Sequence, residues 1–333
     1  MEKVLAPISF YNGRKMPIIG LGTWQSSPDE VEKAVDAALQ AGYRHIDTAA
    51  TYGNEAAIGR ALQKWLESGK IKREDLFIVT KLPPVGNRAE CVEKYLKKSL
   101  AALQLQYVDL YLIHYPVGLQ ELQDESFPKD KDGNILFDMN TDHISLWKAM
   151  EAQVDAGRAL SIGLSNFSAE QIKRIWRSAR VRPANLQVEL HVYLQQRELR
   201  AFCRALDITV VSYFTLGSPR YYSYIENLGL DVSRIPKQHP LSDAVVLRIA
   251  QKHGKSAAQV LLRFVMQLGV AVIPKSTNPE HIQQNFDVFD FELSPEDMYS
   301  LEALDKGERG RQVNDVIFPG QENHPEYPWK YHY

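Results

Sequence analysis

The hydrophobic and polar positions of this chain follow two spacings in turn. Short runs of Val, Ile and Leu recur, and most are followed by stretches in which apolar residues return every three to four positions. The first spacing is typical of buried strands, and the second is typical of amphipathic helices. In the first such unit the apolar run is 18–22, and the helical positions are Val31, Ala34, Val35, Ala38 and Leu39.

The ends of this first helix carry recognisable signals. Ser27 can cap the first turn, Pro28 fits the first helical position, and Glu30 can complete a capping box with Ser27. Gly42 stands where a glycine is expected after the last helical residue. We therefore expect a helix that begins just after Ser27 and ends before Gly42.

The same strand-then-helix unit repeats along the chain. The expected strands are Ile18–Gly22, His45–Asp47, Leu76–Lys81, Val108–His114, Leu160–Ser165, Leu186–Leu190, Ile208–Tyr213 and Val270–Lys275. The expected helices include Glu55–Glu67, Ala89–Leu103, Leu146–Ala156, Ala169–Arg177, Asp243–Lys252 and Ala257–Leu268. Strands of this kind that alternate with helices indicate a parallel sheet covered by helices.

Eight repeats favour a closed (β/α)8 barrel, which takes about 250 residues plus insertions. A doubly wound sheet is the alternative. The stretch 20–25 reads Gly-Leu-Gly-Thr-Trp-Gln and lacks the Gly-x-Gly-x-x-Gly fingerprint that such a sheet often carries after its first strand. We expect one barrel domain over residues 1–333.

Other segments lie outside the repeat. Residues 8–11 and 15–18 flank Asn12-Gly13, a pair that tolerates the positive φ angles of a tight turn, so an N-terminal β-hairpin is expected. The long non-repeating segments are 116–143, 214–241 and 307–333. The first two follow strands four and seven and are therefore expected as long loops on the C-terminal face of the barrel, where loops of such length are usually functional.

Composition and charge exclude several classes of protein. The formal net charge is -2, without a long run of like charge, so nothing indicates a nucleic acid or a membrane surface as partner. The first ten residues lack the apolar core of a signal peptide, and no stretch resembles a membrane-spanning helix. Cys91 and Cys203 are far apart and do not suggest a disulfide framework. We expect a cytoplasmic protein, with monomer as the favoured state.

Polar residues stand at the C-terminal ends of the expected strands, the end at which barrel enzymes build their active sites. Asp47, Lys81 and His114 end strands two, three and four, and Tyr52 lies in the loop after strand two. Any one of them has a structural explanation, such as a buried ion pair. Four titratable groups at three neighbouring strand ends are more simply explained by an active site.

These side chains suit the delivery of a proton to a carbonyl oxygen. A lysine ammonium beside Tyr52 favours the phenolate and is expected to lower the pKa of the tyrosine, which is about 10 in free solution. Asp47 would hold that ammonium in place, and a neutral His114 could orient the carbonyl group. No recognised zinc spacing includes these residues, so a catalytic metal is not expected.

The sequence closely resembles the aldo-keto reductases. The motifs that carry this resemblance are Gly42–Ala49, Tyr52–Glu55, Val79–Leu82, Asp109–His114, Ile162–Phe167 and Ile273–Ser276. They follow one another in the usual order from about residue 8 to the C-terminus. The tail motif His324–Pro328 is similar to that of the subgroup with aldose, aldehyde and hydroxysteroid reductases.

The resemblance implies a catalytic tetrad of Asp47, Tyr52, Lys81 and His114, with Tyr52 as proton donor and NADPH as hydride donor. It implies that Ser165, Asn166 and Gln187 hold the carboxamide and that Tyr213 stacks on the nicotinamide ring. Lys275, Ser276, Asn278 and Asn285 would bind the adenosine end. The further cofactor contacts expected from the family are Thr23, Trp24, Asp47, Leu216, Ser218, Thr277, His281 and Gln284.

Departures from the family pattern affect cofactor and substrate preference. His281 stands where an arginine usually clasps the 2′-phosphate of NADPH, and Gln284 replaces a common glutamate. We expect NADPH to be preferred, with NADH also accepted to some extent. Pro83-Pro84 and Tyr115 replace frequent tryptophans. These changes predict a wider pocket than that of the aldose-reductase type.

The substrate is expected to be a small molecule with a lipophilic carbonyl, such as a steroid, a retinoid, an isoprenoid or an aldehyde. The expected substrate contacts are Trp24, Tyr52, His114, Tyr115, Phe127 and Tyr222. Tyr222 belongs to a tyrosine group at 221, 222 and 224 that could either form a pocket rim or pack its own loop. The alternatives are a polyol-forming sugar aldehyde reductase, a hydroxysteroid dehydrogenase working in the oxidising direction, and a non-catalytic NADPH-binding protein.

Overall fold

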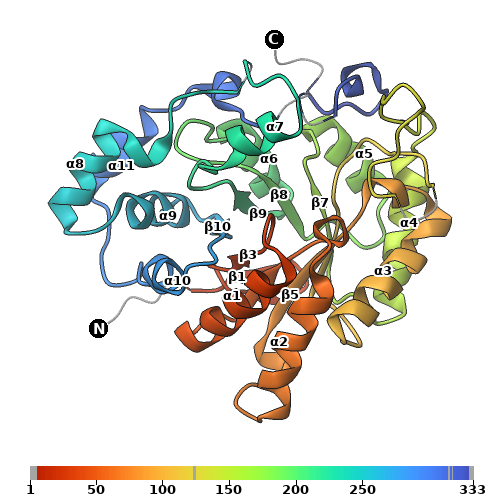
Figure 1. The fold of residues 1–333 in the computed structure, drawn as a ribbon, viewed down its shortest axis with the longest axis horizontal. Helices are drawn as coiled ribbons and strands as arrows, with labels where there is room; N and C mark the ends of the chain where they lie inside the picture. The colour runs from red at the N-terminus through yellow and green to blue at the C-terminus, as the bar shows by residue number, and fades with distance from the viewer. Residues whose placement is uncertain (1–5, 123–124, 234, 314–315, 317, 330–333) are drawn as a thin grey trace.

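The structure is a computed structural model. It describes residues 6–122, 125–233, 235–313, 316 and 318–329. The ends of the predicted N-terminal and C-terminal segments, residues 1–5 and 330–333, lie outside the described residues. Helices surround a central set of strands (Figure 1).

The described part of the chain holds eight parallel strands, and neighbours in the sequence are neighbours in the sheet. The strands are β3 (Leu21–Gly22), β4 (His45–Asp47), β5 (Phe77–Leu82), β6 (Leu110–Ile113), β7 (Ile162–Ser165), β8 (Asn185–Glu189), β9 (Thr209–Tyr213) and β10 (Ala271–Val272). Parallel bridges join Ile19 to Val272 and Gly22 to Lys275, which connects the first strand to the last. The sheet therefore closes on itself, and the predicted (β/α)8 barrel is confirmed.

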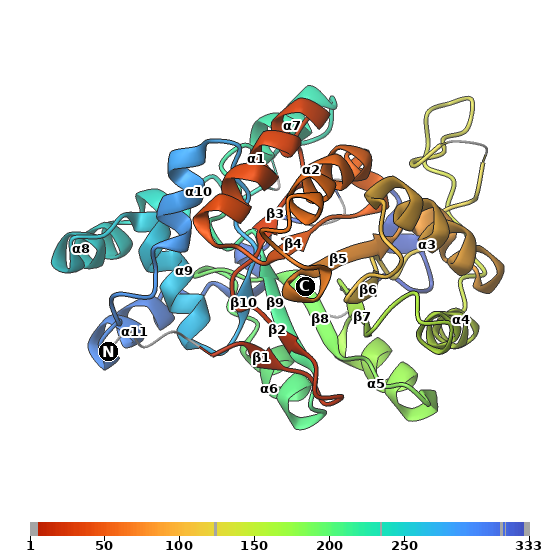
Figure 2. The ribbon, with the colours of Figure 1, turned by 90° about the horizontal axis from the view of Figure 1, so that it is seen from below.

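The helices pack around this barrel, and Figure 2 shows the same arrangement from below. The α-helices are α1 (Pro28–Ala41), α2 (Glu55–Glu67), α3 (Ala89–Leu103), α4 (His143–Asp155), α5 (Ala169–Ser178), α6 (Arg197–Ala205), α7 (Tyr221–Asn227), α8 (Ala244–His253), α9 (Ala257–Gln267), α10 (Pro279–Phe286) and α11 (Pro295–Glu302). Short 3-10 helices occupy Ala50–Tyr52, Arg73–Asp75, Pro84–Gly86, Pro240–Ser242, Gly307–Gly310 and Gln321–Asn323.

Helix α1 has the ends that its sequence predicts. The Ser27 side chain accepts the N–H of Glu30 at 3.4 Å, and the Glu30 carboxylate accepts the N–H of Ser27 at 3.0 Å. Gly42 ends the helix with a φ of 108°, a left-handed conformation that a glycine adopts without strain. These capping contacts are worth about 1 kcal/mol and fix where the helix begins.

Every residue of β5, β6, β7 and β8 is buried. One face of these strands fills the barrel interior and the other is covered by helices, which explains why the strand sequences are apolar without alternation. The core is therefore continuous around the barrel, and it holds the strand ends rigidly.

The predicted hairpin forms from β1 (Ile8–Ser9) and β2 (Lys15–Met16). Phe10 packs edge-on against Phe77, the first residue of β5, with ring centres 5.9 Å apart. Asn12 donates to the hydroxyl of Ser161, just before β7, at 3.0 Å. The hairpin thus covers the N-terminal strand ends, at the opposite end of the molecule from α7 (Figure 2).

Some elements differ from the sequence-based expectation. The last strand is much shorter than Val270–Lys275, because Pro274 has no N–H to donate and Lys275 pairs only through an isolated bridge. Helices α6 and α11 were not predicted. In α6 Cys203 is buried, and Leu199, Phe202 and Leu206 pack partly buried against the core at helical spacing, so the sequence does carry a helical pattern there. Helix α7 was also missed, within the segment 214–241.

Candidate active site

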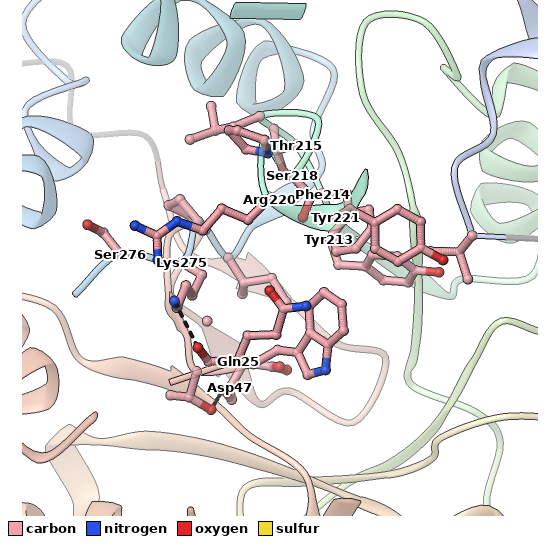
Figure 3. Close-up of a pocket in the computed structure, with 18 of the residues that line it drawn as sticks. Gln25, Asp47, Tyr213, Phe214, Thr215, Ser218, Arg220, Tyr221, Lys275 and Ser276 are labelled. Carbon is pink, nitrogen blue, oxygen red and sulfur yellow. Dashed lines mark hydrogen bonds between the residues drawn. The ribbon is translucent and has the colours of Figure 1, made fainter. Parts of the chain in front are cut away.

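A pocket of about 850 Å³ opens at the C-terminal ends of the strands. Figure 3 shows part of its lining. All the predicted cofactor residues line it, namely Thr23, Trp24, Asp47, Ser165, Asn166, Gln187, Tyr213, Leu216, Ser218, Lys275, Ser276, Thr277, Asn278, His281, Gln284 and Asn285. Tyr52 and His114 line it too, whereas Lys81 is fully buried beside them. The volume is in the range expected for a small-molecule site.

Asp47 and Lys81 form a buried ion pair at the floor of the pocket. Nζ of Lys81 lies 2.6 Å from Oδ1 of Asp47 and donates to the carbonyl oxygen of Thr48 at 2.9 Å. The other oxygen of Asp47 accepts from the side-chain amide of Gln187 at 2.7 Å. Both charges are thus hydrogen-bonded on more than one side, which a buried ion pair needs to be tolerated.

Tyr52 and His114 meet above this pair. The Tyr52 hydroxyl lies 3.5 Å from Nζ of Lys81, and the Tyr52 ring packs edge-on against His114 with centres 5.6 Å apart. Tyr52 is the last residue of a short 3-10 helix, which Gly53 ends in a left-handed conformation. Nδ1 of His114 lies 3.3 Å from the Thr51 hydroxyl. The four residues of the predicted tetrad are therefore brought together in space.

Burial and charge act on these groups in different directions. Burial alone would lower the pKa of Lys81, but the Asp47 carboxylate and Tyr52 raise it above its usual value. Burial lowers the pKa of His114 well below its usual range, and the Lys81 ammonium lowers it further. His114 is therefore neutral at pH 7, as expected from the sequence.

The expected lowering of the Tyr52 pKa was wrong in its net direction. Burial raises the pKa of Tyr52, and the ammonium of Lys81 offsets only part of that rise. A phenolate in a site with little water loses more solvation than a single cation at 3.5 Å restores. Tyr52 consequently holds its proton firmly in this structure.

Asn166 ties three strand ends together beside the tetrad. Its amide nitrogen donates to the carbonyl oxygen of His114 at 3.0 Å and to the hydroxyl of Ser165 at 3.1 Å. Its side-chain oxygen accepts from the Tyr213 hydroxyl at 2.6 Å. These bonds fix the Tyr213 ring at the wall of the pocket.

Backbone strain gathers at this pocket. Four non-glycine residues that line it have a left-handed backbone: Gln25 (φ 58°), Asn166 (φ 66°), Phe214 (φ 56°) and Ser218 (φ 44°). The other such residues in the described chain are Gln104, Gln196 and Asp207, which lie at helix ends. Each strained residue costs of order 1 kcal/mol or more, and such residues cluster at functional sites. The clustering supports a functional pocket.

The far end of the pocket is built around the start of α10. The Asn278 side chain accepts the N–H groups of Glu280 at 2.8 Å and His281 at 3.3 Å, so the predicted helix start at Asn278-Pro279 is confirmed. Nζ of Lys275 donates to the carbonyl oxygen of Gln25 at 3.2 Å (Figure 3). A lysine beside a helix N-terminus is a favourable place for a phosphate.

One wall of the pocket is aromatic and comes from the segment 214–241. The ring of Trp24 lies 5.6 Å from Phe214, 6.2 Å from Tyr221 and 5.2 Å from Tyr224, measured between ring centres. Tyr221 and Tyr224 line the pocket, but Tyr222 does not. The structure does not place Tyr222 in the pocket lining as the predicted substrate contact requires, because α7 has positions 221 and 224 on one helix face and turns 222 away.

The opposite wall holds the other predicted aromatic contacts. Tyr115 and Phe127 both line the pocket, as expected. The ring of Phe318 lies between them, with centres 5.7 Å from Tyr115 and 5.6 Å from Phe127. The Tyr115 hydroxyl donates to the side chain of Gln321 at 2.6 Å. The C-terminal segment therefore completes this wall.

Several pocket residues were not found from the sequence. They include Gln25, Thr51, Phe214, Arg220, Val313 and Phe318. Most of them are neighbours of predicted site residues in the same loops. Their position in those loops was therefore the sequence feature that could have indicated them. Phe318 had only a weak signal, as an aromatic residue in a segment outside the barrel repeat.

Other features of the described residues bear on the class of protein. Cys91 and Cys203 are buried free thiols. Among these residues, no cluster of three or more His, Cys, Asp or Glu side chains is arranged to hold a metal ion. The described helices also include none with the length and apolar character needed to cross a membrane.

Comparisons with known proteins agree with this fold and site. The model of the aldo/keto reductase family matches residues 18–306. Aldo-keto reductase family 1 member A1 is 45% identical in Mus musculus and 46% identical in Homo sapiens, each over 97% of this chain and 97% of the relative. The solved aldose reductase from Schistosoma japonicum is 42% identical with a TM-score of 0.87, over 98% of this chain and 99% of that chain.

The closed barrel and these comparisons together define the class of protein as a barrel oxidoreductase. The chain belongs to the aldo-keto reductase family. It is an NADP-dependent oxidoreductase that acts on the carbonyl groups of small molecules.

Proposed function

We propose that this enzyme reduces a lipophilic aldehyde or ketone with NADPH and that Tyr52 donates the proton. The observation that carries this proposal is the contact chain from Asp47 through Lys81 to Tyr52 at the floor of the pocket. The direct test is a substrate panel of sugars, small aldehydes, steroids and isoprenoids, read by the loss of NADPH absorbance. Failure to consume NADPH with any of them would favour a non-catalytic cofactor-binding protein.

The pocket fits a nicotinamide dinucleotide. Nε2 of Gln25 is buried in the pocket wall and has no hydrogen-bond partner among the described residues. Lys275 and the start of α10 offer positive charge at the far end. The residues proposed to hold the nicotinamide are Ser165, Asn166, Gln187 and Tyr213. Those proposed for the rest of the cofactor are Thr23, Trp24, Asp47, Leu216, Ser218, Lys275, Ser276, Thr277, Asn278, His281, Gln284 and Asn285.

When bound, NADPH supplies the hydride for the carbonyl carbon. Tyr52 then passes its hydroxyl proton to the carbonyl oxygen, which becomes strongly basic as the hydride arrives. Lys81 stabilises the phenolate that Tyr52 leaves behind, and Asp47 keeps this ammonium charged and in place. When the Thr51 hydroxyl donates to Nδ1 of His114, Nε2 carries the proton and can bond the carbonyl oxygen.

The raised pKa of Tyr52 is compatible with this role. A donor must hold its proton until the substrate oxygen becomes basic, and burial ensures that Tyr52 stays protonated at neutral pH. The ammonium of Lys81 acts mainly in the transition state, because negative charge appears on the Tyr52 oxygen only then. Its contribution is therefore to the rate of proton transfer and not to the resting charge of the tyrosine.

The pH dependence of the chemical step follows from these shifts. The active form needs protonated Tyr52, which is lost only as pH rises through its raised pKa, and neutral His114, which is lost only as pH falls through its lowered pKa. We expect the single-turnover rate of the preformed NADPH complex to be flat from about pH 6.5 to about pH 10, between the ordinary pKa values of the two side chains. A rate that falls steadily across this range would contradict the assignment.

The walls of the pocket support a lipophilic substrate. Trp24, Tyr115 and Phe127 line it together with Phe318 and Val313 from the C-terminal segment. Such walls bury apolar surface readily and offer few partners for sugar hydroxyls. Tyr115 adds a further constraint, because its hydroxyl is already engaged with Gln321 and presents mainly its ring.

We expect KM to fall by about fourfold for each CH₂ added along a homologous series of straight-chain aldehydes, because each buried CH₂ is worth about 0.8 kcal/mol. The measurement is steady-state kinetics on that series at saturating NADPH. Phe127→Ala should flatten the trend for the longer aldehydes by removing apolar wall. A wild-type KM that does not change with chain length, or efficient turnover of glucose or xylose, would contradict the lipophilic pocket. Either result would favour a polyol-forming reductase.

A further inference from the structure

Two cationic side chains reach the cofactor end of the pocket from different loops. Lys275 follows β10, and Arg220 lies in the segment 214–241, just before α7. Figure 3 shows the Arg220 side chain extending across the pocket towards Lys275 and Ser276. Asp47 is the carboxylate among the described lining residues, and it is bonded to Lys81 at the opposite end. This end of the pocket therefore gathers positive charge without a lining carboxylate to neutralise it.

Arg220 has no ion-pair or hydrogen-bond partner for its guanidinium among the described residues. The nearby carboxylate of Glu30 is engaged in the α1 capping box, where it accepts from the N–H of Ser27 at 3.0 Å and its hydroxyl at 2.9 Å. An arginine that faces another cation across a pocket is unfavourable unless an anion comes between them.

The electrostatics of Lys275 agree with this arrangement. Burial lowers its pKa, the Arg220 guanidinium lowers it further, and Glu30 opposes them only weakly. Lys275 is thus in a position where a neighbouring negative charge would be strongly stabilising. The site lacks such a charge from its own lining residues, so a ligand is the natural source.

The position of Arg220 is fixed by its neighbour. Tyr221 is fully buried and packs against Trp24 and Phe214. The backbone of Arg220 is therefore anchored at the rim, although its guanidinium is exposed. Binding of a ligand would then have to order the Arg220 side chain but not its backbone.

We propose that Arg220, acting with Lys275 and Ser276, recognises the 2′-phosphate of NADPH in this enzyme and takes the place of the arginine missing at position 281. This inference rests on the proposed function, because it assumes that NADPH is the hydride donor. A terminal phosphate carries close to two negative charges at neutral pH, and Lys275 alone supplies one cation. An arginine fork can bond two phosphate oxygens, whereas the side chain of His281 is shorter and offers no such fork.

The proposal predicts different effects on the affinities for NADPH and NADH, since only NADPH carries the 2′-phosphate. In Arg220→Gln we expect the Kd for NADPH to rise by about tenfold or more, the range for a lost charge-assisted hydrogen bond. The Kd for NADH should be essentially unchanged. Adenosine 2′,5′-bisphosphate should lose affinity in parallel with NADPH. Binding is read by quenching of tryptophan fluorescence, to which Trp24 in the pocket contributes, and by calorimetry.

Lys237→Gln is the matched control, because it removes one exposed cation from the same segment outside the pocket. It should leave all three affinities unchanged. His281→Arg in the Arg220→Gln background should restore most of the lost NADPH affinity, since it returns a guanidinium to the start of α10. Arg220→Lys should bind NADPH more tightly than Arg220→Gln but less tightly than the wild type, because an ammonium cannot bond two phosphate oxygens as a guanidinium does.

The outcomes distinguish the proposal from the function on which it rests. Equal losses of NADPH and NADH affinity in Arg220→Gln would assign Arg220 to the shared pyrophosphate and overturn the 2′-phosphate assignment. Unchanged NADPH affinity would overturn it as well. A wild-type protein that binds NADPH through Arg220 yet never oxidises it would instead refute the proposed function and leave this inference standing.

Discussion

A Tyr52→Phe variant is expected to fold and to bind NADPH as the wild type does, while its turnover falls by about a thousandfold or more. The substitution removes one oxygen atom, and with it the donor that lies 3.5 Å from Nζ of Lys81. The ring and its edge-on contact with His114 remain. The loss should therefore appear in the chemical step and not in cofactor affinity.

The measurement is single-turnover NADPH oxidation with a good aldehyde substrate, together with the Kd for NADPH from tryptophan fluorescence. Tyr107→Phe, which changes a tyrosine outside the pocket, serves as the control and should retain full activity. Near-normal turnover in Tyr52→Phe would show that Tyr52 is not the proton donor. A large loss of NADPH affinity would mean that the hydroxyl serves cofactor binding instead.

The fold was largely predictable from the sequence because its helices are strongly patterned. The predicted bounds Glu55–Glu67 and Ala89–Leu103 are those of α2 and α3. Both helices bury a continuous apolar stripe, and such periodicity is the most reliable local signal. The strand limits were less accurate: the apolar run 270–273 indicates a strand, but β10 covers only Ala271–Val272, because Pro274 has no N–H to continue the pairing.

The candidate site was predictable where residues sit directly at strand ends. Asp47, Lys81 and His114 lie at or next to the ends of β4, β5 and β6, so the topology of a parallel barrel brings them together. The net pKa direction of Tyr52 was not predictable. It depends on how much burial outweighs one neighbouring ammonium, and a sequence does not give the solvent exposure of a side chain.

Residues on the long segments needed the structure. Tyr222 and Tyr224 look equivalent in the sequence, and only the phase of α7 separates them. Arg220 similarly reads as one charged residue in a loop until the buried Tyr221 fixes its backbone at the pocket rim. In irregular segments the direction of a side chain is set by tertiary packing, for which local sequence carries little information.

Lys81→Met is expected to lower turnover about as severely as Tyr52→Phe, and in addition to destabilise the fold by about 3–5 kcal/mol. Removing the ammonium leaves the carboxylate of Asp47 buried with Gln187 as its remaining side-chain partner. Burial of Tyr52 is then unopposed by a cation, so its pKa rises further and the phenolate formed by proton donation lacks its counter-charge. The measurements are denaturant unfolding and the single-turnover rate.

The double variant Asp47→Asn with Lys81→Met separates these two effects. Because it replaces the buried charge by a neutral amide, it should recover most of the stability lost in Lys81→Met. Its turnover should stay low, since a neutral pair cannot stabilise the phenolate of Tyr52. If turnover returned together with stability, Lys81 would act only by holding the fold, and the electrostatic role proposed for it in proton transfer would have to be abandoned.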